Sequence, residues 1–352
     1  MQREALLARH ETEIIDGASQ IFQLNPEKLD QFEAFEGCEN LVYACERHSQ
    51  PVILRVSFRP DRSYGQILAE VDFIRFLCEN GVRAAGPIPS ADGNFVETLP
   101  LSEGDLYLVC FERGRGMRVP DNGYRYRQDA PIEEYFQNWG SILGQMHRLS
   151  QRYFIKDPRI TRPDWFKLHA NKLNLDALLL QDLPEVRNRI DQLLHEIRAL
   201  PKENASYGLI HGDFNDGNFT VDYSTGDITV FDFDDSCYFW FAYELAAAWE
   251  GGIGRVMFEG LEKRKAFMDH YIDQVLSAYL QQNQLTDEWV GRIPVFIKLI
   301  QVEELLHYMR YYKDQDQESL PHLRYLIRCV EEDLPYMGFF DSIYSPERPF
   351  AL

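Results

Sequence analysis

Three polar side chains in one short segment have the types and the spacing to bind a metal ion and to orient an alcohol. Within residues 208–236, two short apolar runs at 219–222 and 228–231 flank Tyr-Ser-Thr-Gly-Asp, which is a good hairpin turn. Asn218 directly precedes the first run, and Asp232 directly follows the second. Because antiparallel pairing brings these two ends together, the sequence predicts a carboxamide oxygen and a carboxylate side by side.

Two hard oxygen donors suit Mg²⁺, since proteins bind this ion through few ligands together with waters and phosphate oxygens. Asp213 lies five residues before Asn218, in a tight loop that contains glycine. Its carboxylate would be close to the metal, where it could receive or orient the hydroxyl group of a substrate. Positioning dominates in a loose phosphoryl-transfer transition state, so an ordinary carboxylate with a pKa of about 4 is sufficient. The segment therefore predicts phosphoryl transfer to an alcohol.

The elements around this segment change in character along the chain. The first 112 residues contain β-rich runs and one helix that ends at Gly81, whereas the pattern beyond residue 130 is helical apart from a short β segment at 207–234. The strands are expected at 41–46, 52–58, 94–99 and 106–112, and the helices at 63–81, 131–153, 183–200 and over most of 243–338. The sequence predicts an α+β protein of two lobes, a small β-rich one at 1–112 and a large, mainly helical one at 113–352.

The site segment resembles a known family. HGDFNDGN followed by VFDFDD is similar to the signature of the aminoglycoside phosphotransferase family, which includes choline and homoserine kinases and is distantly related to protein kinases. The Asp-Phe-Asp-Asp run, with Ala-Tyr-Glu-Leu-Ala-Ala-Ala after it, most resembles bacterial stress-response and spore-coat-associated members. The resemblance implies a bilobal protein-kinase-like fold with ATP in the cleft between the lobes. It implies that Asp213 is the catalytic aspartate, that Asn218 and Asp232 bind magnesium, and that Asp234 lies near the metal.

The same resemblance implies a nucleotide site in the small lobe. Arg55, in Val-Ile-Leu-Arg-Val, stands where the family more often has a lysine against the α and β phosphates, and Glu70 would pair with it. The Glu-Gly-Cys-Glu-Asn turn takes the place of the phosphate-covering loop, although no Gly-x-Gly-x-x-Gly is present. Leu-Val-Cys-Phe-Glu takes the place of the hinge that contacts adenine through backbone groups. From these two segments we expect nucleotide contacts at Gly37, Asn40, Cys110 and Glu112.

Three further polar residues are expected to be structural. His211 is predicted to brace the site loop by a hydrogen bond, and His147 to pack on one face of an amphipathic helix. Glu244 stands where the family usually has the aspartate of an Asp-Leu-Ala segment, and we expect a structural role for it as well.

The composition limits the partners and the location of the protein. A formal net charge of −20, from 36 basic and 56 acidic side chains, disfavours nucleic acid and anionic membrane. The acidity could attract an amine-bearing small molecule, or it could serve only to keep the protein soluble. Six cysteines without a Cys-x-x-Cys pair predict reduced thiols and no zinc site. We find no signal-peptide pattern and no apolar run long enough to span a bilayer, so we expect a cytoplasmic protein.

Three functions fit these observations. The first is a Mg·ATP-dependent phosphotransferase that moves the γ-phosphate to a hydroxyl group of a small molecule. The second is a protein serine/threonine kinase of the stress-response type, and the third is a non-catalytic nucleotide-binding or coat-associated protein. The complete Asp–Asn–Asp set argues against the third function. The acceptor is expected to contact loops near 115–130, 160–175 and 240–260, and the sequence predicts neither the identity of the acceptor nor the oligomeric state.

Overall fold

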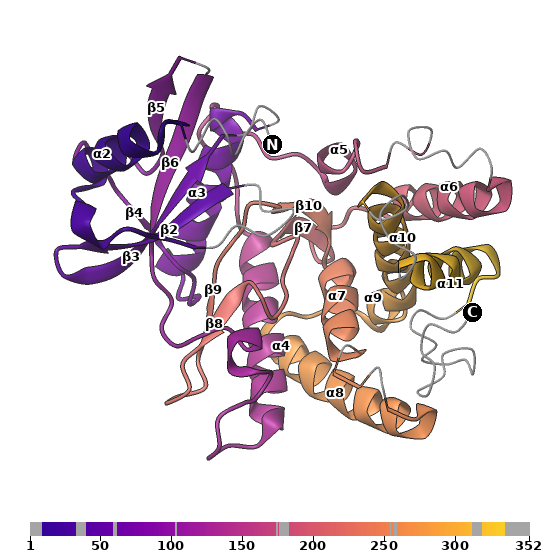
Figure 1. Ribbon diagram of the computed structural model, residues 1–352. Coiled ribbons are helices and arrows are strands. Elements are labelled where there is room, and N and C mark those ends of the chain that lie inside the picture. Colours follow the sequence, from indigo (N-terminus) through magenta and orange to yellow (C-terminus); the bar gives the residue numbers. More distant parts are fainter. Residues whose placement is uncertain are drawn as a thin grey trace.

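The computed structural model has two parts, an N-terminal antiparallel sheet and a mainly helical C-terminal part, which confirms the predicted protein-kinase-like architecture (Figure 1). The last strand of the N-terminal sheet ends at Glu112. The domain boundary that the sequence predicts at this point stays a prediction. The structure describes residues 9–32, 40–58, 62–102, 104–173, 175, 183–253, 255–256, 259–311 and 319–334.

The N-terminal sheet is antiparallel throughout, with strand order β1-β2-β3-β6-β4 and with β5 also paired to β6. Its strands are β1 (Asp30–Gln31), β2 (Asn40–Arg47), β3 (Gln50–Ser57), β4 (Pro87–Ile88), β5 (Glu97–Leu101) and β6 (Gly104–Glu112). Side chains alternate between the two faces of each strand. Leu54 and Cys110 therefore pack in a core with helix α2 (Glu11–Phe22), whereas Arg55 and Phe111 point to the opposite face.

Helix α3 (Tyr64–Glu79) packs on that opposite face and is well specified by local sequence. Ser63 and Gln66 form a capping box at its start, which satisfies amide groups that a helix leaves free. The chain leaves the helix through Gly81, whose φ of 89° is costly for residues with a side chain. Glu70 is fully buried within α3 and faces the sheet.

The C-terminal part is built from helices around a large aromatic core. The helices are α4 (Ile132–Ser150), α5 (Trp165–Leu168), α6 (Pro184–Arg198), α7 (Phe241–Ile253), α8 (Leu261–Gln282), α9 (Asp287–Val290), α10 (Ile293–Tyr311) and α11 (Ser319–Glu331), and short 3-10 turns lie at Pro26–Lys28 and Pro120–Asn122. Helices α4 and α8 approach closely at Gly140, because glycine has no side chain to keep them apart. A Cβ at this position would lie only 2.0 Å from the backbone oxygen of Val275. No helix of the described residues is both long and apolar enough to cross a membrane.

Two short hairpin-like pairs lie between the sheet and these helices and carry the predicted site (Figure 1). Strand β8 (Phe219–Val221) pairs with β9 (Ile228–Val230) in the predicted register, with Phe219 opposite Val230. Strand β7 (Tyr207–Ile210) pairs with β10 (Cys237–Trp240). The sequence did not predict β10, whose aromatic residues pair with β7, and helix α7 begins at Phe241, close to the start of the predicted helical region at residue 243.

Candidate active site

A buried ion pair joins the sheet to helix α3. The Arg55 guanidinium donates through Nη1 to Glu70 Oε1 and through Nη2 to Glu70 Oε2, at 2.7 Å in each case. The two side chains are 6% and 0% exposed. Burial opposes the charge on the guanidinium, but the carboxylate of Glu70 outweighs it and raises the pKa of Arg55. The pair holds a fixed positive group on the face of β3 that points toward the helical part.

The loop that follows β7 is held in a strained shape by three contacts. Gly212 has a φ of 90°, and a Cβ at this position would lie 2.1 Å from the backbone oxygen of Asp235. Only glycine therefore fits there. The Gly212 N–H donates to Glu244 Oε1 at 2.9 Å, and His211 Nε2 lies 2.9 Å from the backbone oxygen of Phe231. The predicted bracing contact of His211 is thus present, and Asp213 follows in a defined position.

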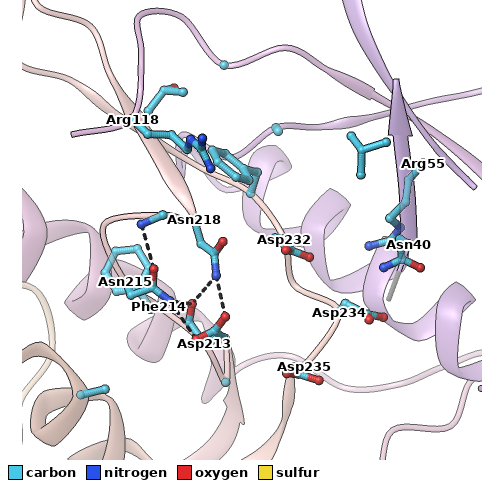
Figure 2. Close-up of a pocket in the computed structure, with 18 of the residues that line it drawn as sticks. Asn40, Arg55, Arg118, Asp213, Phe214, Asn215, Asn218, Asp232, Asp234 and Asp235 are labelled. Atoms are coloured by element: carbon cyan, nitrogen blue, oxygen red, sulfur yellow. Dashed lines mark hydrogen bonds between the residues drawn. The ribbon is translucent and has the colours of Figure 1, made fainter. Parts of the chain in front are cut away.

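Two asparagines fix the Asp213 carboxylate (Figure 2). Asn215 Nδ2 donates to Asp213 Oδ1 at 2.8 Å, and Asn218 Nδ2 donates to Oδ2 at 2.7 Å. Asn218 Nδ2 also donates to the Asp213 backbone oxygen at 2.8 Å. Burial raises the pKa of Asp213, and the charge of Asp235 adds to this, whereas His211 and the two asparagines act in the opposite direction. The carboxylate is anchored at both oxygens and faces the open space of the pocket.

Asn218 and Asp232 offer the oxygen atoms that the sequence predicts. Because the Asn218 amide nitrogen is used by Asp213, its oxygen is the atom left for a cation. Asp232 has a φ of 63°, and among the described residues no side chain or amide donates a hydrogen bond to its carboxylate. Burial raises the pKa of Asp232 to about 7, with Arg55 opposing and Asp234 adding to the shift. The Asp232 side chain is exposed to the cavity, so its ionised carboxylate is available to bind a cation.

These donors fit a magnesium ion. No group of three His, Cys, Asp or Glu side chains in the described part of the chain is arranged to hold a metal by itself. One amide oxygen and the carboxylates of Asp232 and Asp234 would leave half of an octahedral shell to phosphate oxygens and water, as suits Mg²⁺. In Figure 2, Asp232, Asp234 and Asp235 follow one another along the segment that faces Asp213 and Asn218, and Arg55 lies on the strand beyond them.

A cavity of about 1240 Å³ connects these groups and extends between the sheet and the helices. Its far wall carries carboxyl groups from α7 and α10, namely Glu250, Glu303 and Glu304. Burial raises the pKa of Glu250 and that of Glu303 to about 7. Asp213, Asn218 and Asp232 line the same cavity as these carboxyl groups.

Comparison with known proteins identifies the family. Residues 32–289, more than half of the chain, match the model of the phosphotransferase enzyme family. The chain belongs to this family. A relative, amicoumacin kinase of Bacillus subtilis (strain 168), is 29% identical over 316 residues, which cover 88% of this chain and 90% of the relative.

Solved structures agree with the assignment. An amicoumacin kinase in complex with AMP-PNP, Ca²⁺ and Ami superposes with a TM-score of 0.83 at 26% identity, covering 95% of this chain and 97% of that one. A microcompartment-associated aminopropanol kinase gives a TM-score of 0.69 at 20% identity, covering 93% and 99%, and this likeness concerns the fold alone. The phosphotransferase uses ATP and a divalent metal ion, and it phosphorylates hydroxyl groups of small molecules.

The structure brings most of the predicted residues of the phosphotransferase together. Those that line the cavity are Asn40, Arg55, Glu112, Asp213, Asn218, Asp232 and Asp234. Glu70 lies behind Arg55, and the Cys110 thiol packs in the core under α2, where burial raises its pKa to about 12. Gly37 lies outside the described residues. The individual roles of all these residues stay predictions.

The acceptor side of the phosphotransferase was only partly predicted. Each of the three expected segments contributes to the cavity, for example through Arg118, Trp165 and Ala247, although the last two lie in helices α5 and α7 and not in loops. The contribution of α10 was missed, although Glu303 and Glu304 interrupt an apolar helical run and Glu250 does the same near the end of α7. A charged side chain within an apolar helical run could have indicated these residues, because such groups are rarely buried unless they have a partner or a function.

Proposed function

We propose that this phosphotransferase moves the γ-phosphate of ATP to a hydroxyl group of an amine-bearing small molecule, and that it works in the cytoplasm. The observation that carries the proposal is the position of Asp213. Its carboxylate lines the same cavity as Asn218 and Asp232 and as the half-buried carboxyl groups of Glu250 and Glu303. An acceptor with a hydroxyl group near an ammonium group could therefore place the first at Asp213 and the second at the far wall.

The nucleotide side of the cavity supports the roles that the sequence predicts. Arg55 would contact the phosphates of ATP, since its charge is fixed by Glu70 and it faces the cavity. The oxygen of Asn218 and the carboxylates of Asp232 and Asp234 would hold Mg²⁺. The ion would neutralise charge that develops on the β and γ phosphate oxygens. Asn40 and Glu112 line the same cavity, beside the phosphates and the adenine in this arrangement.

Asp213 would act on the acceptor. Its two oxygens are held by Asn215 and Asn218, so a third hydrogen bond from an acceptor hydroxyl group would have a defined direction. This contact aligns the hydroxyl oxygen with the γ-phosphate, and the carboxylate takes up the proton as the new bond to phosphorus forms. Because Asp213 is anchored in the free protein, little reorganisation is required when the acceptor binds.

The far wall favours a cationic group on the acceptor. Glu250 and Glu303 have pKa values of about 7, so both are partly protonated at neutral pH. An ammonium group bound between them would stabilise the ionised forms, because an opposite charge lowers the pKa of a carboxyl group. The net charge of −20 would add a long-range attraction for cations. The similarity to amicoumacin kinases makes amicoumacin the first compound to test.

The test is an acceptor screen that measures ADP release with Mg·ATP. Amino alcohols and amicoumacin are compared with the same compounds after N-acetylation, which removes the charge and keeps the hydroxyl group. The proposal predicts at least a tenfold lower kcat/KM for the acetylated compounds, equal to about 1.4 kcal/mol. Equal use of both sets would refute the ammonium contact, and phosphate transferred to serine or threonine of a protein would favour a protein kinase.

A further inference from the structure

Arg162 is a buried cation with an unusual set of partners. It is 8% exposed and lies in the segment between α4 and α5. Its guanidinium donates to the backbone oxygen of Gln66 at 3.0 Å and to that of Phe233 at 3.0 Å. It also donates to the backbone oxygens of Asp234 and Ser236. All four acceptors are uncharged carbonyl groups, so burial lowers the pKa of Arg162.

Three of these carbonyl groups belong to the segment that carries the proposed metal ligands. Phe233, Asp234 and Ser236 form a turn directly after Asp232, in which the Ser236 N–H donates to the Phe233 oxygen at 2.9 Å. Asp232 itself has a φ of 63°, a conformation that costs of the order of 1 kcal/mol and persists only where the surroundings impose it. The guanidinium of Arg162 supplies such a constraint, since its planar fork fixes the direction of several acceptors at once.

The fourth carbonyl group belongs to helix α3. In an α-helix the oxygen of Gln66 is the acceptor for the amide of Glu70, four residues later. Arg162 is therefore one helical turn away from the residue that holds Arg55. The segment of Arg162 is itself fixed at this end, because a Cβ on Gly65 would lie 2.2 Å from the Arg159 oxygen and the Thr161 N–H donates to the Gly65 oxygen at 3.3 Å.

We propose that Arg162 is a positioning residue that fixes the metal-binding segment 232–236 against helix α3. In this arrangement the distances between the guanidinium of Arg55 and the carboxylates of Asp232 and Asp234 are fixed. The metal and the phosphates of ATP would therefore bind to a preformed site. The inference rests on the proposed roles of Asp232 and Arg55, and it adds a residue that contacts neither the metal nor the nucleotide.

The test compares Arg162→Lys and Arg162→Met with the wild-type enzyme. Lysine keeps the charge but offers three donors at one point, whereas methionine keeps the apolar stem alone. Arg159→Met is the matched control, because Arg159 lies in the same segment but is 69% exposed and pairs with Asp157. The rate is measured as a function of Mg²⁺, ATP and acceptor concentration, and the binding of ADP is measured without metal.

We expect the Mg²⁺ concentration for half-maximal rate to rise by roughly tenfold in Arg162→Met, with a smaller rise in Arg162→Lys. We expect kcat to fall by roughly 10- to 100-fold, and the KM for the acceptor and the affinity for metal-free ADP to stay within twofold. The control should match the wild type. An unchanged Mg²⁺ dependence in folded Arg162→Met would overturn the positioning role.

Asp232→Asn separates this inference from the proposed function. If Asp232→Asn leaves the Mg²⁺ dependence unchanged, the metal assignment itself is wrong. If Asp232→Asn changes it and Arg162→Met does not, only the role of Arg162 is wrong. If neither Arg162 variant folds, the positioning role is tested instead by amide hydrogen exchange of the native enzyme. The Ser236 amide, which donates to the Phe233 oxygen, and the Glu70 amide, which donates to the Gln66 oxygen, should then open with the same free energy, and faster exchange of Ser236 alone would overturn the proposal.

Discussion

The role proposed for Asp213 depends on the orientation of its carboxylate. Each of its carboxylate oxygens accepts an amide hydrogen bond, from Asn215 and from Asn218, and the Gly212 amide before it is held by Glu244. These contacts fix the position of the carboxylate before any substrate binds. Asn218 would link the carboxylate proposed to orient the acceptor to the oxygen proposed to bind the metal, so a change at either site is expected to affect the other.

The replacement Asp213→Asn keeps the size of the side chain and removes its charge. We expect kcat to fall by about 10² to 10⁴, because the variant can neither orient nor deprotonate the acceptor hydroxyl group. The dissociation constant of Mg·ATP, measured by calorimetry, should change by less than about threefold. Asp129→Asn, at a side chain that is 76% exposed, is the control. Turnover of Asp213→Asn within tenfold of wild type would disprove the assignment.

Glu303 predicts a pH-dependent stability. Burial raises its pKa from 4.5 to about 7 in the folded state, while the Tyr243 hydroxyl, which donates to Oε2 at 3.0 Å, acts against the shift. Between these two pKa values the unfolded state ionises first, so the free energy of unfolding falls as the pH rises from about 4.5 and levels off above about 7. At about 1.4 kcal/mol per pKa unit, the loss is at most about 3 kcal/mol.

The glutamine side chain of Glu303→Gln cannot ionise, so this variant should not lose unfolding free energy between pH 4.5 and about pH 7 through this group. We expect its Tm relative to wild type to increase when the pH is raised from 5 to 8, as measured by calorimetric unfolding without ligand. Glu196→Gln on α6, at an exposed position, should show no such increase. A difference in Tm that stays constant from pH 5 to 8 would mean that Glu303 titrates near its ordinary pKa.

At the scale of the elements, α7 and α4 hold the catalytic loop through a buried polar chain. Glu244 on α7 accepts from Gly212 and lies 2.6 Å from His147 Nε2 on α4, and His147 Nδ1 lies 2.9 Å from the Tyr279 hydroxyl on α8. Asn283 Nδ2 donates to the same hydroxyl at 2.8 Å. All four side chains are buried. The structural roles predicted for His147 and Glu244 fit a network in which three helices are tied to one loop.

Removing Glu244 should therefore be costly. Glu244→Ala leaves the Gly212 N–H and the Nε2 atom of His147 without a partner, and we expect the free energy of unfolding to fall by about 3 to 5 kcal/mol. Chemical denaturation measures this change. Glu288→Ala on α9, whose side chain is 68% exposed and pairs with Arg292, should change the free energy by less than about 0.5 kcal/mol. A loss below about 1 kcal/mol for Glu244→Ala would show that the chain does not hold the loop.

The sequence predicts those parts of this fold that depend on local signals. The turn at 223–227, the cap at Ser63 and the apolar runs of β3 and β6 are each set by neighbouring residues, and they correctly predict the hairpin, helix α3 and the sheet. The pairing of β10 with β7 depends on residues about thirty positions apart, and the sequence predicted no strand at 237–240. The bonds of Arg162 and the carboxyl groups on α10 depend on packing over still longer separations, for which the sequence carries no periodic signal.

At the scale of the whole molecule, the proposed nucleotide site is divided between the sheet and the helical part. Arg55 belongs to the sheet, whereas Asp213, Asn218 and Asp232 belong to the helical part, so Mg·ATP would contact both. Ligand at a hundredfold excess over its Kd should add about 2.7 kcal/mol to the free energy of unfolding. We expect a clear rise in Tm with Mg·ATP and a smaller one with ATP and EDTA. Equal Tm values with and without EDTA would argue against a metal bridge between the lobes.

The central claim is that one cation is held by the Asn218 oxygen and the Asp232 carboxylate beside Asp213. The most direct test is a crystal structure with a non-hydrolysable ATP analogue, an acceptor and Mn²⁺ in place of Mg²⁺, in which anomalous scattering locates the metal. The account predicts an anomalous peak within about 2.0 to 2.4 Å of both oxygen atoms and an acceptor hydroxyl group within about 3.2 Å of Asp213. A metal bound away from Asn218 and Asp232, or an acceptor hydroxyl group far from Asp213, would contradict it.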